Sequence, residues 1–144
     1  MAYDRADWHY GGDYPKDLPP ENGGTHIGMF LAWIITRNLE SALLREVSPI
    51  ALDAVRKREI TGRDYLFDQC DEKFIDQDVS DEGNAFTQAY YEANTYLEDY
   101  ERVLGQGLAS LYEVPDTWAN FDVIAPVIDD RFRRWKDRER SKTI

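Results

Sequence analysis

The stretch from Ile27 to Ile35 constrains the fold more than any other part of the chain, because apolar side chains occupy nearly every direction around a helix there. A helix that is apolar all round is stable only when the rest of the protein surrounds it. The run is far shorter than the roughly 20 residues that a membrane span needs. The sequence therefore predicts a central, buried helix over residues 26–45, with Thr25 as its N-cap.

Capping residues mark two further helix starts. Ser48 is a cap, and Pro49 suits the first position of a helix that ends near Glu59. Thr61 begins another helix, in which Asp64 three residues later completes a weak capping box. This helix is expected to end between residues 70 and 72.

Periodicity predicts the last two helices. Apolar residues recur at steps of four and three over residues 83–104, which is the pattern of one helical face. A final helix is expected to run from about residue 125 to about residue 139. Because no series of alternating strands is visible, the predicted fold class is mainly α, with residues 1–144 forming a single-domain compact bundle of about five helices.

The two ends of the chain have distinct compositions. Residues 1–24 are rich in glycine and proline and predict an irregular arm, but a disordered tail rarely carries so many rings. We therefore expect an ordered arm that packs its aromatic side chains on the helices, namely Tyr3, Trp8, Tyr10 and Tyr14. Residues 131–144 form a basic helix end and tail, which either stays solvated or folds back on acidic residues.

Charge excludes several classes of function. The chain has 17 Lys and Arg against 28 Asp and Glu, so its net charge of -11 argues against general binding of nucleic acid or of an anionic membrane. Cys70 is the only cysteine, so no internal disulfide and no cysteine zinc cluster can form, and a reducing compartment is the simple interpretation. The first residues lack the features of a signal peptide, and we expect a cytoplasmic protein.

The acidic stretch between residues 63 and 82 is the first candidate site. Carboxylates at this density repel one another and steer a basic partner, and exposed tyrosines beside them would anchor it. The predicted partner-binding residues are Asp68, Asp71, Glu72, Asp76, Asp78, Glu82, Tyr91 and Tyr96. Residues 76–87 fail as a calcium-binding EF-hand loop, because Asp81 and Thr87 stand where glycine and glutamate are needed.

The helix start at residues 23–26 is the alternative site. Two glycines before a helix can expose backbone N–H groups that bind an anion, with His26 assisting, or they can simply form a tight turn. A pocket at this place would be lined by Trp8, His9, Gly24, Thr25, His26 and Trp33. No catalytic motif is present, and Cys70 in a helix is more often a small buried hydrophobe than a nucleophile. We expect no catalytic residues, no cofactor and no metal.

Four blocks of sequence resemble a family of small bacterial proteins without an established activity. They read WHYGGDYP at residues 8–15, GGTHIGMFLAW at 23–33, EGNAF at 82–86 and DTW at 116–118, and the resemblance spans residues 3–135. Small acidic families of this kind often look like immunity proteins of interbacterial toxin systems. The resemblance therefore implies no catalytic residues in this chain.

Three functions compete at this point. The first is an acidic protein-binding module, an immunity protein that neutralises a basic toxin by occluding its active site. The alternative is a small enzyme or anion-binding protein that uses residues 23–26. The third is a homo-oligomer that pairs through the face of residues 86–104.

Overall fold

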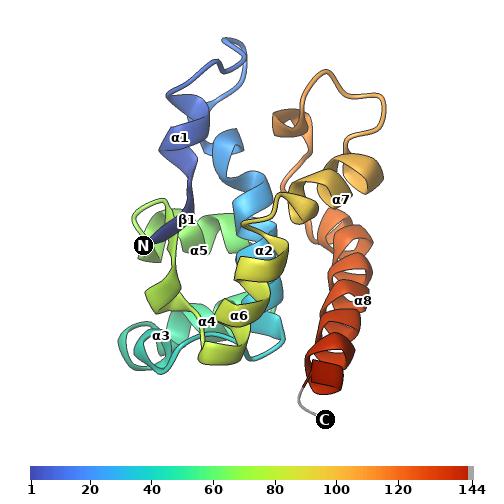
Figure 1. Cartoon of the computed structure of the whole chain (residues 1–144). Helices are drawn as coiled ribbons and strands as arrows, with labels where there is room; N and C mark the ends of the chain where they lie inside the picture. Colours follow the sequence, from blue (N-terminus) through green and yellow to red (C-terminus); the bar gives the residue numbers. More distant parts are fainter. Residues whose placement is uncertain (143–144) are drawn as a thin grey trace.

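The computed structural model describes residues 1–142 and confirms a mainly α fold (Figure 1). The described residues form eight α-helices rather than about five, because two of the expected helices are each broken in two and the arm contains a further short helix, α1. In chain order the helices are α1 (Ala6–Tyr10), α2 (Thr25–Thr36), α3 (Ala42–Val47), α4 (Pro49–Arg56), α5 (Gly62–Gln69), α6 (Asp81–Tyr90), α7 (Thr95–Leu104) and α8 (Trp118–Lys142). Within these residues, no helix combines the length and the apolar character needed to cross a membrane.

Helix α2 is the central helix that the apolar run predicts. Every residue from Thr25 to Ile35 is buried, and the helix lies in the middle of the molecule (Figure 1). It is shorter than expected because Asn38 takes a left-handed backbone conformation with φ 59°, which ends the helical path. Thr25 is not the N-cap: it is the first residue of α2, and its hydroxyl accepts a hydrogen bond from Arg63 at 3.1 Å.

Two glycines allow α2 and α5 to cross in close contact. A Cβ atom on Gly62 would lie 1.9 Å from the carbonyl oxygen of Gly28, and one on Gly28 would lie 2.4 Å from the backbone nitrogen of Arg63. Helix α5 begins as the sequence predicts, because Thr61 and Asp64 form the capping box. The crossing therefore fixes α5 against the buried helix.

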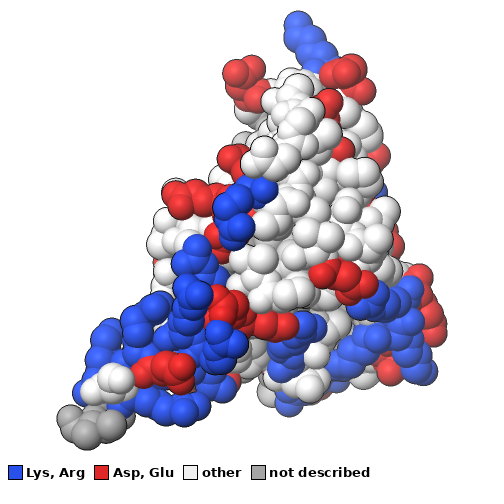
Figure 2. All heavy atoms as spheres, turned by 90° about the vertical axis from the view of Figure 1, so that its right-hand side faces the viewer, with Lys and Arg blue, Asp and Glu red and all other residues white. Residues whose placement is uncertain are grey.

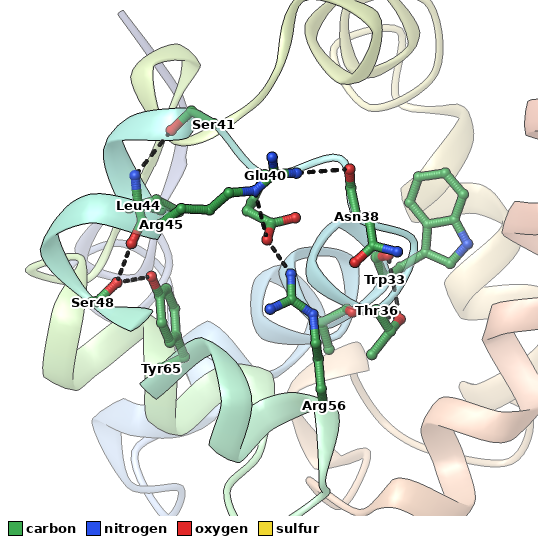
Figure 3. A network of polar contacts seen from close by, with 11 residues as sticks. Trp33, Thr36, Asn38, Glu40, Ser41, Leu44, Arg45, Ser48, Arg56 and Tyr65 are labelled. Carbon is green, nitrogen blue, oxygen red and sulfur yellow. Dashed lines mark hydrogen bonds and ion pairs between the residues drawn. The ribbon is translucent and has the colours of Figure 1, made fainter. Parts of the chain in front are cut away.

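A buried carboxylate joins the end of α2 to α3 and α4. The side chain of Glu40 is fully buried and forms ion pairs with Arg45 and Arg56 (Figure 3). In the same corner, the hydroxyls of Ser48 and Tyr65 are 2.6 Å apart and link the start of α4 to α5 (Figure 3). Pro49 occupies the first turn of α4, as the sequence predicts.

The predicted helix over residues 83–104 is two helices. Asn94 has a left-handed backbone with φ 64°, which separates α6 from α7. The turn redirects the chain so that both helices present rings to the core. Phe86, Tyr90 and Tyr100 of the face expected to pair two copies are buried within one chain, whereas Ala93 on the same face is exposed.

Helix α8 begins seven residues before the expected start, at Trp118, and it includes Pro126 on its exposed side. Asp99 of α7 accepts hydrogen bonds from Arg131 of α8 at 3.0 Å and from Tyr90 of α6 at 2.7 Å. Lys and Arg side chains gather around the C-terminal end of α8 (Figure 2). They are largely paired within the helix, as Arg134 is with Asp130, although Lys136 lies 3.8 Å from Glu82 of α6. Residues 143–144 lie outside the described part of the chain.

The N-terminal arm is ordered but less irregular than expected. Strand β1 (Ala2–Arg5) pairs antiparallel with β2 (Lys73–Ile75), and α1 follows it directly. Three 3₁₀ helices complete the fold, namely η1 (Pro20–Gly24), η2 (Asp76–Asp78) and η3 (Leu111–Glu113). Tyr3 packs on Phe74 with ring centroids 5.2 Å apart, whereas Trp8 is 56% exposed. The sheet attaches the arm to the body and so positions the residues of the candidate site.

Candidate functional site

The fold brings together the only two histidines of the chain. His9 of α1 and His26 of α2 have ring centroids 4.5 Å apart, in an edge-to-face arrangement. Gly23 makes this approach possible, because a Cβ atom there would lie 3.1 Å from the carbonyl oxygen of Ala6 and 3.3 Å from Cβ of His9. The glycine of the sequence motif therefore serves close packing of the arm on η1.

Asp4 lies between the two imidazole rings. Its Oδ1 is 2.8 Å from His9 Nε2, and its Oδ2 is 3.3 Å from His26 Nε2. The carboxylate also accepts hydrogen bonds from the Tyr91 hydroxyl at 2.6 Å and from the Arg5 backbone N–H at 2.8 Å. Sequence analysis missed Asp4, because its position depends on pairing between strands that lie about seventy residues apart in the chain.

A tyrosine from a distant segment fixes the other edge of His9. The hydroxyl of Tyr112, in η3, hydrogen-bonds to His9 Nδ1 at 2.8 Å. His26 contrasts with His9: it is only 2% exposed, and neither of its ring nitrogens has a hydrogen-bond partner. Buried polar groups are usually hydrogen-bonded, so the unpaired nitrogens of His26 require an explanation.

Burial and charge act in opposite directions at this site. Burial alone would raise the pKa of Asp4, but contacts with His26 and His9 overcome it and hold this pKa well below its usual range. Burial lowers the pKa of His26 even though Asp4 opposes the shift, which favours a neutral ring. Burial also raises the pKa of Tyr91 well above its ordinary value, so its hydroxyl remains a hydrogen-bond donor.

A cavity of about 240 Å³ adjoins the three residues. Arm residues form one side of it, and the turn between α6 and α7 forms the other, with Glu92 and Leu97 among the lining residues. Within the described chain, the lining includes two carboxylates and neither lysine nor arginine. The cavity therefore suits a ligand that is cationic or donates hydrogen bonds.

The structure assigns different surroundings to the other residues of the predicted alternative site. Trp8 is exposed, and Arg5 lies over its ring. Trp33 is fully buried and donates a hydrogen bond to Asp129 at 2.8 Å, so neither tryptophan lines the cavity. Gly24 packs on Phe67, where a Cβ atom would lie 2.6 Å from the ring. Because η1 leads directly into α2, the glycines form a tight helical turn.

The predicted partner-binding residues are dispersed over α5, the loop that follows it, η2, α6, the turn after α6 and α7. Asp68, Asp71 and Glu82 are exposed, whereas Asp78 is 6% exposed. Glu72 accepts a hydrogen bond from Tyr10 at 2.7 Å, and Asp76 pairs with the Met1 ammonium at 3.0 Å. The expectation of exposed rings at Tyr91 and Tyr96 is wrong, because both side chains pack in the core beside Phe30.

Cys70 has the properties of a partly buried, unreactive thiol. Burial raises its pKa far above the ordinary value, so the reactive thiolate is scarce at neutral pH. It is also absent from the lining of the cavity. The chemistry available at the site is therefore that of a carboxylate, two imidazoles and phenol hydroxyls: binding of cations, hydrogen bonding and proton transfer.

Fold and site define a small, mainly α-helical protein with an Asp–His–His pocket at the base of an ordered N-terminal arm. The chain belongs to the family described as Domain of unknown function (DUF7832), whose model matches residues 2–114. The matched region contains Asp4, His9, His26, Tyr91 and Tyr112. No curated protein and no solved structure matches the chain.

Proposed function

We propose that the protein binds a small polar molecule in the cavity beside Asp4, His9 and His26, as a ligand-binding protein or a small enzyme. The observation that carries this proposal is the cavity itself, which lies against the only two histidines of the chain. Concave sites with a few converging polar groups are the usual form of small-molecule sites, and this one is slightly smaller than most of them. The two carboxylates favour a cationic or hydrogen-bond-donating ligand over the anion that the glycine motif predicts.

The pair formed by Asp4 and His9 supplies a chemical role for the pocket. A carboxylate that holds one edge of an imidazole fixes the orientation of the ring. In an enzyme of this design, His9 would transfer a proton to or from the bound molecule. Tyr112 would keep the ring in place through its bond to Nδ1.

The imidazole NMR signals provide a direct test, because the chain contains only two histidines. Small amines, amino acids and polyols are added in turn to the ¹⁵N-labelled protein, with the two signals assigned through His9→Gln. We expect at least one class of cationic compound to shift both signals. Leu97→Trp should abolish the shift by filling the cavity, whereas Leu108→Trp, at an exposed position, should not. Shifts that persist in Leu97→Trp, or no shift with any compound, would contradict the proposal.

We also propose a second candidate function, an acidic module that binds a basic protein partner in the cytoplasm, as an immunity protein does. A specific observation supports it: three apolar side chains on α3 and α4 are exposed, Leu43 by 47%, Val47 by 63% and Ile50 by 86%. Such side chains can anchor a partner in place of the buried tyrosines, while exposed carboxylates such as Asp68 steer its approach.

Co-purification with the product of the neighbouring gene tests this second function. The expected result is a complex and protection of cells that express that product. Val47→Asp combined with Ile50→Asp should disrupt the complex, whereas Val123→Asp on α8, which is also exposed, should leave it intact. A chain that neither binds nor protects would exclude an immunity role against that product.

A further inference from the structure

We infer that Asp4, His9 and His26 bind a divalent transition-metal cation of the Zn²⁺ class. The inference concerns the same pocket as the first proposed function and goes beyond it, since it adds a metal ion bound by three of the pocket's side chains. One oxygen or nitrogen atom from each residue can be chosen so that all three lie within 4.8 Å of one another. Two imidazoles and one carboxylate are a common donor set for zinc and for other late first-row metals.

The spacing of the donor atoms suits one small ion. Zinc bonds to nitrogen and oxygen are about 2.0–2.2 Å long, so two ligands of one ion stand about 3–4 Å apart. His26 Nε2 already lies 3.3 Å from Asp4 Oδ2. His9 Nε2 and Asp4 Oδ1 are 2.8 Å apart and would separate slightly as the ion enters between them.

His26 provides the second, independent observation. Its side chain is only 2% exposed, and neither of its ring nitrogens forms a hydrogen bond. The ring nevertheless lines the cavity. An imidazole with an unused lone pair in a buried position costs folding energy unless something binds it. A metal ion at Nε2 would satisfy that nitrogen.

The surrounding hydrogen bonds have the pattern of an outer shell. Metal-bound histidines usually donate their second N–H to an oxygen, and metal-bound carboxylates are hydrogen-bonded in turn. Tyr112 accepts from His9 Nδ1 when Nε2 carries the metal, and the hydroxyl of Tyr91 donates to Asp4. With three protein ligands, the fourth position would face the cavity, which is how catalytic zinc sites receive water or substrate.

The expectation of no metal rests on the single cysteine and on the acidic loop that fails as an EF-hand. The three ligands come from a strand, a short helix and the central helix. Their sequence spacing matches no metal-binding motif, and only the fold brings them together. The exposed acidic residues elsewhere are a separate source of weak, nonspecific metal binding and need a control.

Calorimetric titration of the chelator-treated full chain with ZnCl₂ tests the inference. We expect one ion per chain and a rise in melting temperature. His9→Gln and His26→Gln should each weaken binding about 100-fold or more, because each removes a ligand. Asp81→Asn, which neutralises an exposed carboxylate outside the pocket, should leave the affinity unchanged. Absence of binding, or an affinity that neither histidine substitution weakens relative to the wild type, would overturn the inference.

A milder variant covers the case in which the histidine variants do not fold. Tyr112→Phe removes only the hydroxyl that orients His9, and it should weaken Zn²⁺ binding about 10-fold. An unchanged affinity in this variant would count against the site.

The metal and small-molecule experiments can fail separately. Zn²⁺ binding without any small-molecule shift supports the metal site and contradicts the first proposed function. Small-molecule shifts in a protein that binds no Zn²⁺ support the first proposed function and contradict the metal site.

Discussion

Asp78 shows how the environment of one side chain changes its chemistry. It belongs to the acidic stretch that predicts a charged surface, yet it is buried and accepts a hydrogen bond from the Ile75 backbone N–H at 3.2 Å. Burial raises the pKa of Asp78 to about 6, because few favourable contacts offset the loss of water around the charged form. Asp68 in the same stretch is exposed, as the sequence predicts.

We predict a pH-dependent stability that Asp78→Asn removes. The folded state binds the Asp78 proton more tightly than the unfolded state does, so this group's contribution to stability is complete below about pH 4 and is lost as the pH rises to about 6. The loss is about 3 kcal/mol. Urea unfolding from pH 4 to 7 should therefore show Asp78→Asn becoming more stable than the wild type only toward neutral pH. A constant difference between the two proteins would contradict the raised pKa.

Gly62 gives a second prediction at the residue scale. Gly62→Ala places a methyl group on the backbone of Gly28 and should lower the free energy of unfolding by about 3 kcal/mol or more, since rigid backbone cannot move aside. Gly12→Ala is the matched control, because its new Cβ would lie 3.5 Å from the nearest atom, at ordinary contact distance. Urea titrations that give the two variants equal stability would show that α2 and α5 do not pack this closely.

At the scale of elements, local signals located several helix starts but not every helix end. The capping box at Thr61 and the proline at position 49 act within one turn, so the sequence alone predicts them. The breaks at Asn38 and Asn94 depend on what surrounds the chain, because asparagine tolerates both helical and left-handed conformations. Apolar periodicity continues across the second break and therefore hides it.

Substitution of Asn94 tests whether its left-handed backbone sets the turn between α6 and α7. Asn94→Ala should lower the free energy of unfolding by about 1 kcal/mol. Alanine has a Cβ atom, which disfavours positive φ, and it lacks the polar side chain that makes this conformation tolerable for asparagine. Asn94→Gly should leave it unchanged or raise it slightly. Thermal and urea unfolding provide the measurement. Equal effects of the two substitutions would mean that the backbone conformation is not the cause.

At the scale of the whole molecule, one carboxylate connects three helices. Asp99 is 2% exposed and receives hydrogen bonds from α6, α7 and α8 through Tyr90, Arg102 and Arg131. Arg131 belongs to the basic segment that the sequence presents as a solvated end or a return onto acidic residues. The segment does both in part. Arg131 pairs with Asp99 of α7, while other cations of the segment, such as Arg134, pair within α8.

Asp99→Asn should therefore loosen α8 from the body. We expect a loss of about 2 kcal/mol in the free energy of unfolding, below the value for a fully buried pair because Arg131 is partly exposed. Asp122→Asn breaks the exposed pair with Arg58 and should cost about 0.5 kcal/mol or less. Hydrogen exchange along α8 would show faster opening in the first variant only. Similar exchange in both would place the anchor of α8 elsewhere.

The candidate site is the part of the molecule that the sequence predicts least. Both histidines stand out in the sequence, since there are only two, but Asp4 and Tyr112 carry no local signal. Their roles arise from the pairing of β1 with β2 and from the position of η3. Contacts between segments so far apart are properties of the tertiary structure, which no window of sequence contains.

The contact between His9 and Tyr112 joins positions 103 residues apart, and this separation has a consequence for biosynthesis. The arm leaves the ribosome before the segments that contact its polar side chains, so Asp4 and His9 are without these neighbours while the intervening residues are translated. A product interrupted before Tyr112 would lack the hydroxyl that fixes His9, and one interrupted before Tyr91 would also lack the hydroxyl that binds Asp4.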